Sequence, residues 1–333
     1  MSLIFTLFLL LGISALFVFV IQKLNFSGVV GLILGGLFFG IPMIKNSVVE
    51  PHTEFVFFLG DIGLLCLMFL AGFESSWHKI YHEKKDSLAI SSFAAITPFV
   101  LCFIIFKALG FSTMVAVVIG ISMSITAEAT IAEILLNMNK LKTKVGSAMM
   151  GAGIIDDIFG FLAFMILAHL FGGMAPKEYL FLLAVIVIFF LGICVRTYLH
   201  KKHPFIKVLE KILMWLIVPF FFISIGLNFD LLTLVVNPLT LLLILAVALL
   251  GKIGGTLLAK PCTDLNWKQL FLIGWAMNSR GALEMALVLI AFRVGLLSTE
   301  IYSALIIMAL VTTLMFPLVI NQMIRKNPKI MNG

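Results

Sequence analysis

The chain has 333 residues, of which 62% are hydrophobic and 12% are charged, and its formal net charge at pH 7 is +7. About 25% of the residues of an average soluble domain are charged, so this composition excludes an ordinary soluble fold. The positive charge is typical of loops that face an anionic membrane surface and does not indicate a nucleic-acid partner. The four cysteines are scattered without a CxxC pattern, so neither a disulfide framework nor a metal site is predicted.

Apolar stretches separated by Gly, Pro, Lys and Asn predict an all-α polytopic membrane protein with about 11 transmembrane helices. A helix needs roughly 20 residues to cross the hydrocarbon core, and only the second stretch is marginal in length. In chain order, we predict spans at residues 2–22, 27–44, 54–74, 87–109, 112–138, 144–171, 178–199, 208–228, 236–259, 267–292 and 297–323.

The distribution of lysine and arginine predicts the orientation of these helices. Seventeen of these residues lie in the loops that follow odd-numbered helices or in the C-terminal segment, and four lie in the other loops. Because loops rich in Lys and Arg remain in the cytoplasm, we expect the N-terminus outside and the C-terminus inside. The lipid bilayer is the expected surrounding, in a cytoplasmic (inner) membrane.

Ionisable residues also occur inside the predicted spans, where charge is costly and usually faces a cavity or another charge. At 1.5 Å per residue, Asp156 lies about 18 Å beyond Lys144, and Arg280 lies about 18 Å beyond Lys268. These depths predict one site near the membrane midplane, and a buried ion-pair network that only joins helices remains the alternative. The residues concerned are Asp61, Glu128, Glu133, Asp156, Asp157, Lys252, Arg280 and Glu284.

Two spans contain polar interruptions, S-I-T-A-E-A-T at 124–130 and M-N-S-R-G-A-L-E at 277–284. Each interrupted span has one helix before it and one after it, and the two spans run in opposite directions. Small polar residues in a span favour unwound backbone that lines a cavity. Two inverted three-helix units with matching interruptions are typical of a secondary transporter whose site lies at the midplane.

Several motifs together resemble the monovalent cation:proton antiporter-2 family over most of the chain. They are the segment 124–160 with its G-I-I-D-D-I-F-G end, L-A-G-F-E at 70–74, F-F-F-I-S-I-G-L-N-F-D-L at 220–231, G-K-I-G-G at 251–255 and N-S-R-G-A-L-E at 278–284. The two adjacent aspartates followed later by Gly-Lys indicate the NapA-like, double-aspartate branch of sodium/proton antiporters.

The resemblance implies a role for each matching residue. Asp157 would carry the cation or the proton, Asp156 would pair with Lys252, and Thr126 would line the site. We expect supporting or gating roles for Ser124, Glu128, Arg280 and Glu284. The resemblance also implies a homodimer, no cofactor and no enzymatic activity, with electrogenic exchange of sodium or lithium for protons by an elevator mechanism.

The resemblance further implies the NhaA/NapA-like antiporter fold, with inverted repeats and two crossed discontinuous helices. Within it, residues 1–53 would begin the scaffold or dimerisation domain, and 54–171 would form the first core repeat with its break near 124–130. Residues 172–235 would supply a linker helix and a scaffold helix, and 236–333 the second core repeat with its break near 277–282.

Two features depart from the family pattern. Family members usually have about thirteen helices, and two are absent here after the seventh, on the dimerisation side. Glu128 replaces a residue that is usually uncharged, which leaves potassium/proton exchange or potassium efflux as the alternative function. A sensor or channel with the same fold is a second alternative, although a channel favours a continuous polar stripe. No protease, hydrolase or cofactor motif is present.

Overall fold

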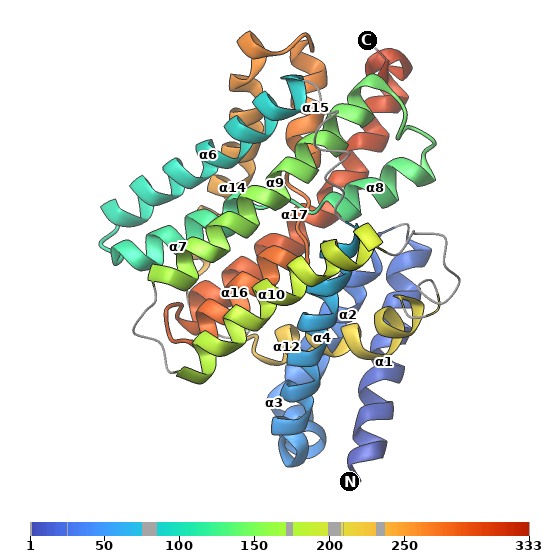
Figure 1. Cartoon of the computed structure of the whole chain (residues 1–333), viewed down its shortest axis with the longest axis vertical. Helices are drawn as coiled ribbons and strands as arrows, with labels where there is room; N and C mark the ends of the chain where they lie inside the picture. The colour runs from blue at the N-terminus through green and yellow to red at the C-terminus, as the bar shows by residue number, and fades with distance from the viewer. Residues whose placement is uncertain are drawn as a thin grey trace. The chain divides into compact units, whose positions relative to one another are not determined.

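A computed structural model describes residues 2–24, 26–74, 85–170, 176–198, 208, 210–230 and 237–332, and every regular element in these residues is helical (Figure 1). The chain divides into two compact units. Unit 1 comprises Met1–Ser76 and Gly172–Asp230, and unit 2 comprises Trp77–Phe171 and Leu231–Gly333. Each unit is therefore assembled from two separate stretches of chain.

Unit 1 is a set of apolar helices in which α2 packs against α1 and α12, and α4 packs against α10 and α12. A π-helical turn at Lys45–Val49 and a 3-10 turn at Glu50–His52 connect α3 to α4. Another π-helical turn, Leu213–Ile217, leads into α12. The helices are α1 (Leu3–Lys23), α2 (Gly28–Gly40), α3 (Pro42–Ile44), α4 (Thr53–Glu74), α10 (Pro176–Tyr198) and α12 (Val218–Leu227).

Glycines let α2 approach its neighbours closely on two sides. A Cβ atom at Gly35 would lie 2.9 Å from the Cα of Ser14 on α1. On another side of α2, a Cβ at Gly36 would lie 2.9 Å from the Cα of Ile223 on α12. Helices in lipid associate through such small-residue contacts, because burial of apolar surface gives little driving force there.

The pair of α4 and α10 is joined in the same way. A Cβ at Gly72 would lie 2.9 Å from the carbonyl carbon of Phe189, and one at Gly192 would lie 2.8 Å from the backbone nitrogen of Phe73. Near the end of α10, Nη1 of Arg196 donates to the carbonyl of Phe73 at 3.0 Å. Close backbone contact and this hydrogen bond hold the two helices together.

Unit 2 contains two helices that are interrupted by unwound backbone. The first interruption separates α7 from α8, and the second separates α15 from α16. Helices α6, α9, α14 and α17 surround them, with extensive packing of α6 on α7 and α14. The bounds are α6 (Lys85–Ala108), α7 (Thr113–Ser124), α8 (Glu128–Asn137), α9 (Lys144–Leu170), α14 (Pro238–Leu258), α15 (Trp267–Ala276), α16 (Ala282–Arg293) and α17 (Thr299–Lys326).

Local capping explains where several of these helices begin. The Ser112 hydroxyl accepts from the backbone N–H of Val115 at the start of α7. At the start of α15, Asn266 and Gln269 form a reciprocal capping box. Such side chains satisfy the free N–H groups of a first turn and stabilise the helix start by about 1 kcal/mol.

The last described turn, Pro328–Met331, packs on the rest of unit 2 through its two buried residues. Ile330 and Met331 belong to a hydrophobic cluster that also contains residues of α8, α9 and α15. The Gln269 side chain donates to the carbonyl of Ile330 at 3.1 Å. This turn therefore contributes to the packing of the unit.

The predicted spans agree with the helix positions to within a few residues, but the count of eleven is not established. Eight described segments are long and apolar enough to cross a membrane. The prediction at 27–44 corresponds to α2, which has only 13 residues, and the prediction at 267–292 is divided between α15 and α16. Helix α9 has 27 residues, which is sufficient length for a crossing.

The assignment of residues 54–171 to one core repeat differs from the packing of the structure at its first helix. Helix α4 contacts α10 and α12 within unit 1. The reason is the close backbone contact at Gly72 and Gly192, which hydropathy does not reveal. The roles of the two units as scaffold and core remain predictions.

Candidate functional site

The first interruption is a short extended segment between α7 and α8. Ile125 and Ala127 have extended backbone angles, so the helical hydrogen-bond pattern stops after Ser124. The Ser124 hydroxyl donates to the carbonyl of Gly120 at 2.9 Å and to that of Ala95 at 2.8 Å. A serine that bonds back to the preceding turn competes with the helix and favours its ending.

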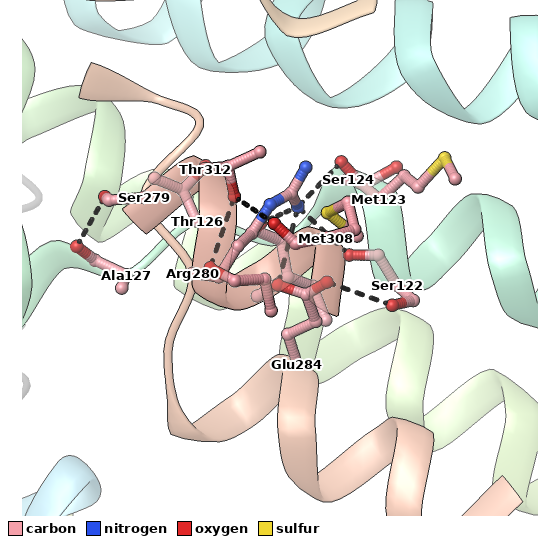
Figure 2. A network of polar contacts seen from close by, with 12 residues as sticks. Ser122, Met123, Ser124, Thr126, Ala127, Ser279, Arg280, Glu284, Met308 and Thr312 are labelled. Carbon is pink, nitrogen blue, oxygen red and sulfur yellow. Dashed lines mark hydrogen bonds and ion pairs between the residues drawn. The ribbon is translucent and has the colours of Figure 1, made fainter. Parts of the chain in front are cut away.

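The second interruption, residues 277–281, lies directly against the first. The backbone N–H of Ala127 donates to the carbonyl of Ser279 at 2.9 Å, and the Ser279 hydroxyl donates to the carbonyl of Ala127 at 3.3 Å (Figure 2). A Cβ at Gly281 would lie 2.7 Å from the Cβ of Ala127, so a side chain at position 281 would disrupt this contact. Hydrogen bonds between the two breaks thus satisfy some of the backbone groups that unwinding leaves without helical partners.

Thr126 joins the first break to the second and also reaches α14. Its hydroxyl donates to the carbonyl of Met277 at 2.9 Å and accepts from Nζ of Lys252 at 2.7 Å. Lys252 also donates to the carbonyl of Ser124. The lysine ammonium is therefore bound by oxygen atoms on both sides of Ile125.

Asp156 on α9 provides the third oxygen ligand of this ammonium. Its Oδ2 lies 2.7 Å from Nζ of Lys252, and its Oδ1 accepts from the hydroxyl of Ser91 on α6 at 3.4 Å. Lys252 is 0% exposed and Asp156 is 1% exposed. A buried ion pair of this kind is tolerated because each charge has further hydrogen-bond partners.

Two glycines on α14 bring Lys252 close to α6 and the first break. A Cβ at Gly251 would lie 2.7 Å from the Cα of Pro98, and a Cβ at Gly255 would lie 3.0 Å from the carbonyl carbon of Phe93. The G-K-I-G-G motif therefore has a packing role. These two glycines allow α14 to lie against α6, and the lysine reaches the Ser124 carbonyl and the Thr126 hydroxyl at the break.

Arg280 in the second break binds the same helix end. Its Nη1 donates to the carbonyls of Ser122 at 3.2 Å, Met123 at 3.0 Å and Ile125 at 2.7 Å (Figure 2). Its backbone N–H donates to the hydroxyl of Thr313 on α17 at 2.9 Å. The guanidinium thus acts as a C-terminal cap for α7, supplied by the other interrupted helix.

Glu284, in the first turn of α16, completes this second charged pair. Its Oε2 lies 3.5 Å from Nη1 of Arg280, and its Oε1 accepts from the Ser122 hydroxyl at 3.1 Å. Arg280 and Glu284 are each 1% exposed. The structure brings the two residues together as neighbours at i and i+4.

Together, Lys252 and Arg280 occupy four consecutive carbonyls at the end of α7, from Ser122 to Ile125. The last carbonyls of a helix lack partners within the helix and carry the negative end of its dipole. Two cationic side chains therefore neutralise this end in the membrane interior. An arrangement of this kind makes the α7 terminus a cation-binding position.

The side chain of Asp157 lies outside the described part of the structure, but its place on α9 follows from the helix. Residues 153, 157 and 160 share one face of a helix, at spacings of four and three. A Cβ at Gly153 would lie 3.3 Å from the Cβ of Glu128, and a Cβ at Gly160 would lie 2.8 Å from Cγ1 of Ile125. The face that includes position 157 therefore lies along the first break.

The structure also adds contacts that hydropathy did not single out. Ser91, Ser122 and Thr313 supply hydroxyls to Asp156, Glu284 and Arg280. All three are nearly or fully buried. The signal available in the sequence was a hydroxyl residue within an apolar helix. For the predicted residue Ser124, the backbone carbonyl meets Lys252, whereas its hydroxyl bonds back to helices α6 and α7.

Comparisons with known proteins identify the class. A sequence model described as "Sodium/hydrogen exchanger, transmembrane" matches residues 7–201 and 165–326. The Na(+)/H(+) antiporter of Enterococcus hirae is 24% identical, covering 92% of this chain and 94% of the relative. The Na(+)/H(+)-K(+) antiporter GerN of Bacillus cereus is 25% identical, covering 87% and 86%.

A solved structure has the same fold. The sodium proton antiporter MjNhaP1 from Methanocaldococcus jannaschii at pH 8 matches with a TM-score of 0.67 and 15% identity, over 98% of both chains. The match to the family model, with the interrupted helices and the buried charges, defines an integral membrane transporter. The chain belongs to the transmembrane sodium/hydrogen exchanger family, a family of cation/proton antiporters and not of enzymes.

Proposed function

We propose that this protein exchanges sodium, and also lithium, for protons across the cytoplasmic membrane. The observation that carries the proposal is the cage of oxygens around the Lys252 ammonium, formed by Asp156, Thr126 and the carbonyl of Ser124. Carboxylate, hydroxyl and carbonyl oxygens are also the ligands that a small hard cation prefers. The Lys252 ammonium, bound by these oxygens, therefore marks a position at which a monovalent cation could bind.

Asp157 is the proposed carrier. A carboxylate at membrane depth exists at low cost either protonated or bound to a cation, but not free and charged. Proton and cation therefore compete for one group, and this competition couples their movements. The break residues opposite position 157 supply the remaining oxygens, with Thr126 as the side-chain ligand.

Asp156 and Lys252 determine the charge balance in this proposal. While no cation is bound, the ammonium neutralises Asp156 at 2.7 Å. Arrival of a cation at the same oxygens displaces the ammonium, and desolvation then favours loss of its proton. More than one proton enters for each cation that leaves, so the exchange is electrogenic.

Alternating access follows an elevator mechanism in this proposal. Unit 2 contains both interruptions and every described group of the site, as a transport domain should. In this proposal its two repeats run in inverted directions and their breaks cross. Unit 1 would be the scaffold and would form the homodimer. The charge bias of the loops supports an N-terminus outside and a C-terminus in the cytoplasm.

Transport by the wild-type protein in proteoliposomes tests the proposal directly. We expect sodium and lithium gradients to drive proton movement, potassium to drive less, and the initial rate to change with a clamped membrane voltage. A rate that does not change with voltage would contradict electrogenic exchange. Absence of proton movement with all three cations would contradict antiport itself.

Replacing Asp156 with Asn separates the partner role from the carrier role. We expect Asp156→Asn to retain exchange while reducing its voltage dependence, because Lys252 loses its counter-charge and remains neutral throughout the cycle. The measurement is the initial rate at two clamped voltages. The matched control is Asp86→Asn, a half-buried carboxylate in the first turn of α6 that accepts from the backbone N–H of Asp264 and takes no part in the site. A variant with full voltage dependence would contradict the proposed charge balance.

Potassium/proton exchange is the second candidate, and Glu128 is the observation that favours it. Its Cα, Cβ and Cγ pack close to Gly153 on the face of α9 that includes position 157. An extra carboxylate near the carrier changes the charge and the number of oxygen ligands of the site, and the choice of cation depends on both. The relative GerN is named as a Na(+)/H(+)-K(+) antiporter. Preference for potassium in the same assay would select this candidate.

A further inference from the structure

Glu284 is the buried charge with the weakest compensation in the described part of unit 2. Asp156 has a lysine at 2.7 Å and a serine hydroxyl, whereas Glu284 has one serine hydroxyl and a guanidinium at 3.5 Å. Nη1 of Arg280 is already engaged with three carbonyls of the α7 end. A buried carboxylate with so few partners has an unfavourable desolvation free energy, and binding a proton removes the charge that causes it.

Unpaired polar atoms surround this carboxylate. Oε2 of Glu284 and both Nε and Nη2 of Arg280 are buried and have no hydrogen-bond partner among the described residues. Oδ1 of Asn278, in the same break, is in the same condition. Buried donors and acceptors of this kind are normally satisfied by ordered water, which also conducts protons. The unpaired Oε2 therefore offers a proton a binding position at the break.

The charge on Glu284 acts on the cation site through a short path. Arg280 and Lys252 bind neighbouring carbonyls of α7, and Lys252, Arg280, Asp156 and Glu284 interact electrostatically. Neutralising Glu284 leaves the positive charge of Arg280 uncompensated beside this helix end. Because like charges repel strongly where water is excluded, a cation would then bind less tightly at the double aspartate.

We propose that Glu284 is a second proton-binding carboxylate whose protonation opposes cation binding at the double aspartate. Oε2 accepts a proton from water and becomes a carboxylic acid, and it returns that proton to water when a cation binds. The inference rests on the proposed function and adds a proton-binding residue in the second repeat. Reciprocity of linked binding requires that the cation lower the affinity of Glu284 for its proton.

Among the side chains that the structure describes, few charged groups lie around Glu284. Arg280 precedes it by one turn, Lys252 is on α14, and Asp156 and Asp157 are on α9. Helix α7 has no titratable side chain, and the charged residues of α17 lie near its two ends. A pH effect that disappears with the carboxyl group of Glu284 is therefore assignable to that residue.

The pH dependence of the apparent KM for sodium tests the inference. Each proton that competes with the cation lowers log KM by up to about one unit per pH unit below the titration range, so Asp157 and Lys252 together give up to about two and a protonated Glu284 adds up to about one more. We expect Glu284→Gln to reduce this slope by about one and to raise KM at high pH by about tenfold. The same change at an α17 terminus, Glu300→Gln, is the matched control and should retain both values.

If Glu284 only stabilised the break, the same experiment would give a different result. Damage to the break would lower the rate at every pH without changing the slope, and Glu284→Asp, which retains a carboxyl group, should restore the steep dependence. An unchanged slope in Glu284→Gln would overturn the inference. If that variant fails to accumulate, proton release by purified Glu284→Asp on sodium addition remains measurable. The retained carboxyl group should release as many protons as wild type but over a shifted pH range, because the shorter side chain changes the distances to Arg280 and Ser122. An unshifted pH range would also overturn the inference.

The outcomes distinguish this inference from the proposed function. If wild-type protein exchanges cations and the slope is independent of Glu284, only the second proton site fails. If wild-type protein gives no exchange with sodium, lithium or potassium, the proposed function fails first.

Discussion

Proteoliposomes containing Asp157→Asn are expected to show no cation-driven proton movement above the leak of empty vesicles. The amide binds neither the proton nor the cation with the affinity of a carboxylate. Loss of one partner from a buried charge interaction costs about 3–5 kcal/mol, which corresponds to a loss of cation affinity of roughly 10²- to 10⁴-fold. The measurement is the initial rate of internal pH change after a sodium pulse.

The control for this variant is Asp264→Asn in the exposed loop before α15. It makes the same chemical change away from the breaks and should retain the wild-type rate. Asp157→Asn should also retain wild-type abundance and thermal stability, because its loss is functional. Normal proton flux in Asp157→Asn would refute the assignment of the carrier, whatever the activity of the control.

The second large effect is expected from Arg280→Met. This change leaves three buried carbonyls of α7 and the Glu284 carboxylate without their cation. Breaking a buried pair on one side costs about 3–5 kcal/mol, so we expect a lower Tm of the purified protein together with loss of transport. Arg280→Lys should recover only part of the stability, because an ammonium does not match the planar guanidinium in binding spread acceptors.

Arg325→Met, at the exposed end of α17, is the matched control for this loss of stability. Exposed charges contribute about 0–1 kcal/mol, so its Tm should remain near that of wild type. The double variant Arg280→Met/Glu284→Gln should be more stable than Arg280→Met alone, since it no longer leaves an uncompensated carboxylate. Equal Tm values for wild type and Arg280→Met would show that the guanidinium is not what holds the α7 end.

Much of the helix pattern could be predicted because membrane depth restricts the sequence strongly. The expected break at 124–130 corresponds to unwound backbone between Ser124 and Glu128, and the expected break at 277–282 corresponds to the segment between Ala276 and Ala282. Small polar residues within an apolar run are costly unless the backbone needs them. This cost makes both breaks visible in the sequence.

The contacts made by backbone carbonyls could not be predicted in the same way. The sequence indicated that the ionisable residues within spans, among them Arg280 and Glu284, face a cavity or another charge. The structure adds three carbonyls of α7, which belong to residues whose side chains are neutral. Every residue has a backbone carbonyl, so residue type does not show which carbonyls accept hydrogen bonds. That depends on how two breaks distant in the sequence pack together.

The grouping of α4 with α10 and α12 was also hidden from hydropathy. Hydropathy predicts which segments cross the lipid, but it does not predict which helices pack against each other. The signal was present in the small residues of each helix, such as Gly72 and Gly192, but a glycine does not indicate its partner. Neighbour choice depends on shape matching along a whole helix.

The glycine contacts of unit 1 have a consequence for random mutagenesis. Any side chain at Gly36, Gly72 or Gly192 would overlap the backbone of a neighbouring helix, so the affected helices must separate. Such changes will be recovered as loss-of-transport alleles although they lie in a unit that contains none of the ion-binding groups described above. Measuring membrane abundance alongside growth on salt will identify these changes as folding alleles, because their abundance falls. Alleles that keep normal abundance but lose transport should lie mainly around the two breaks.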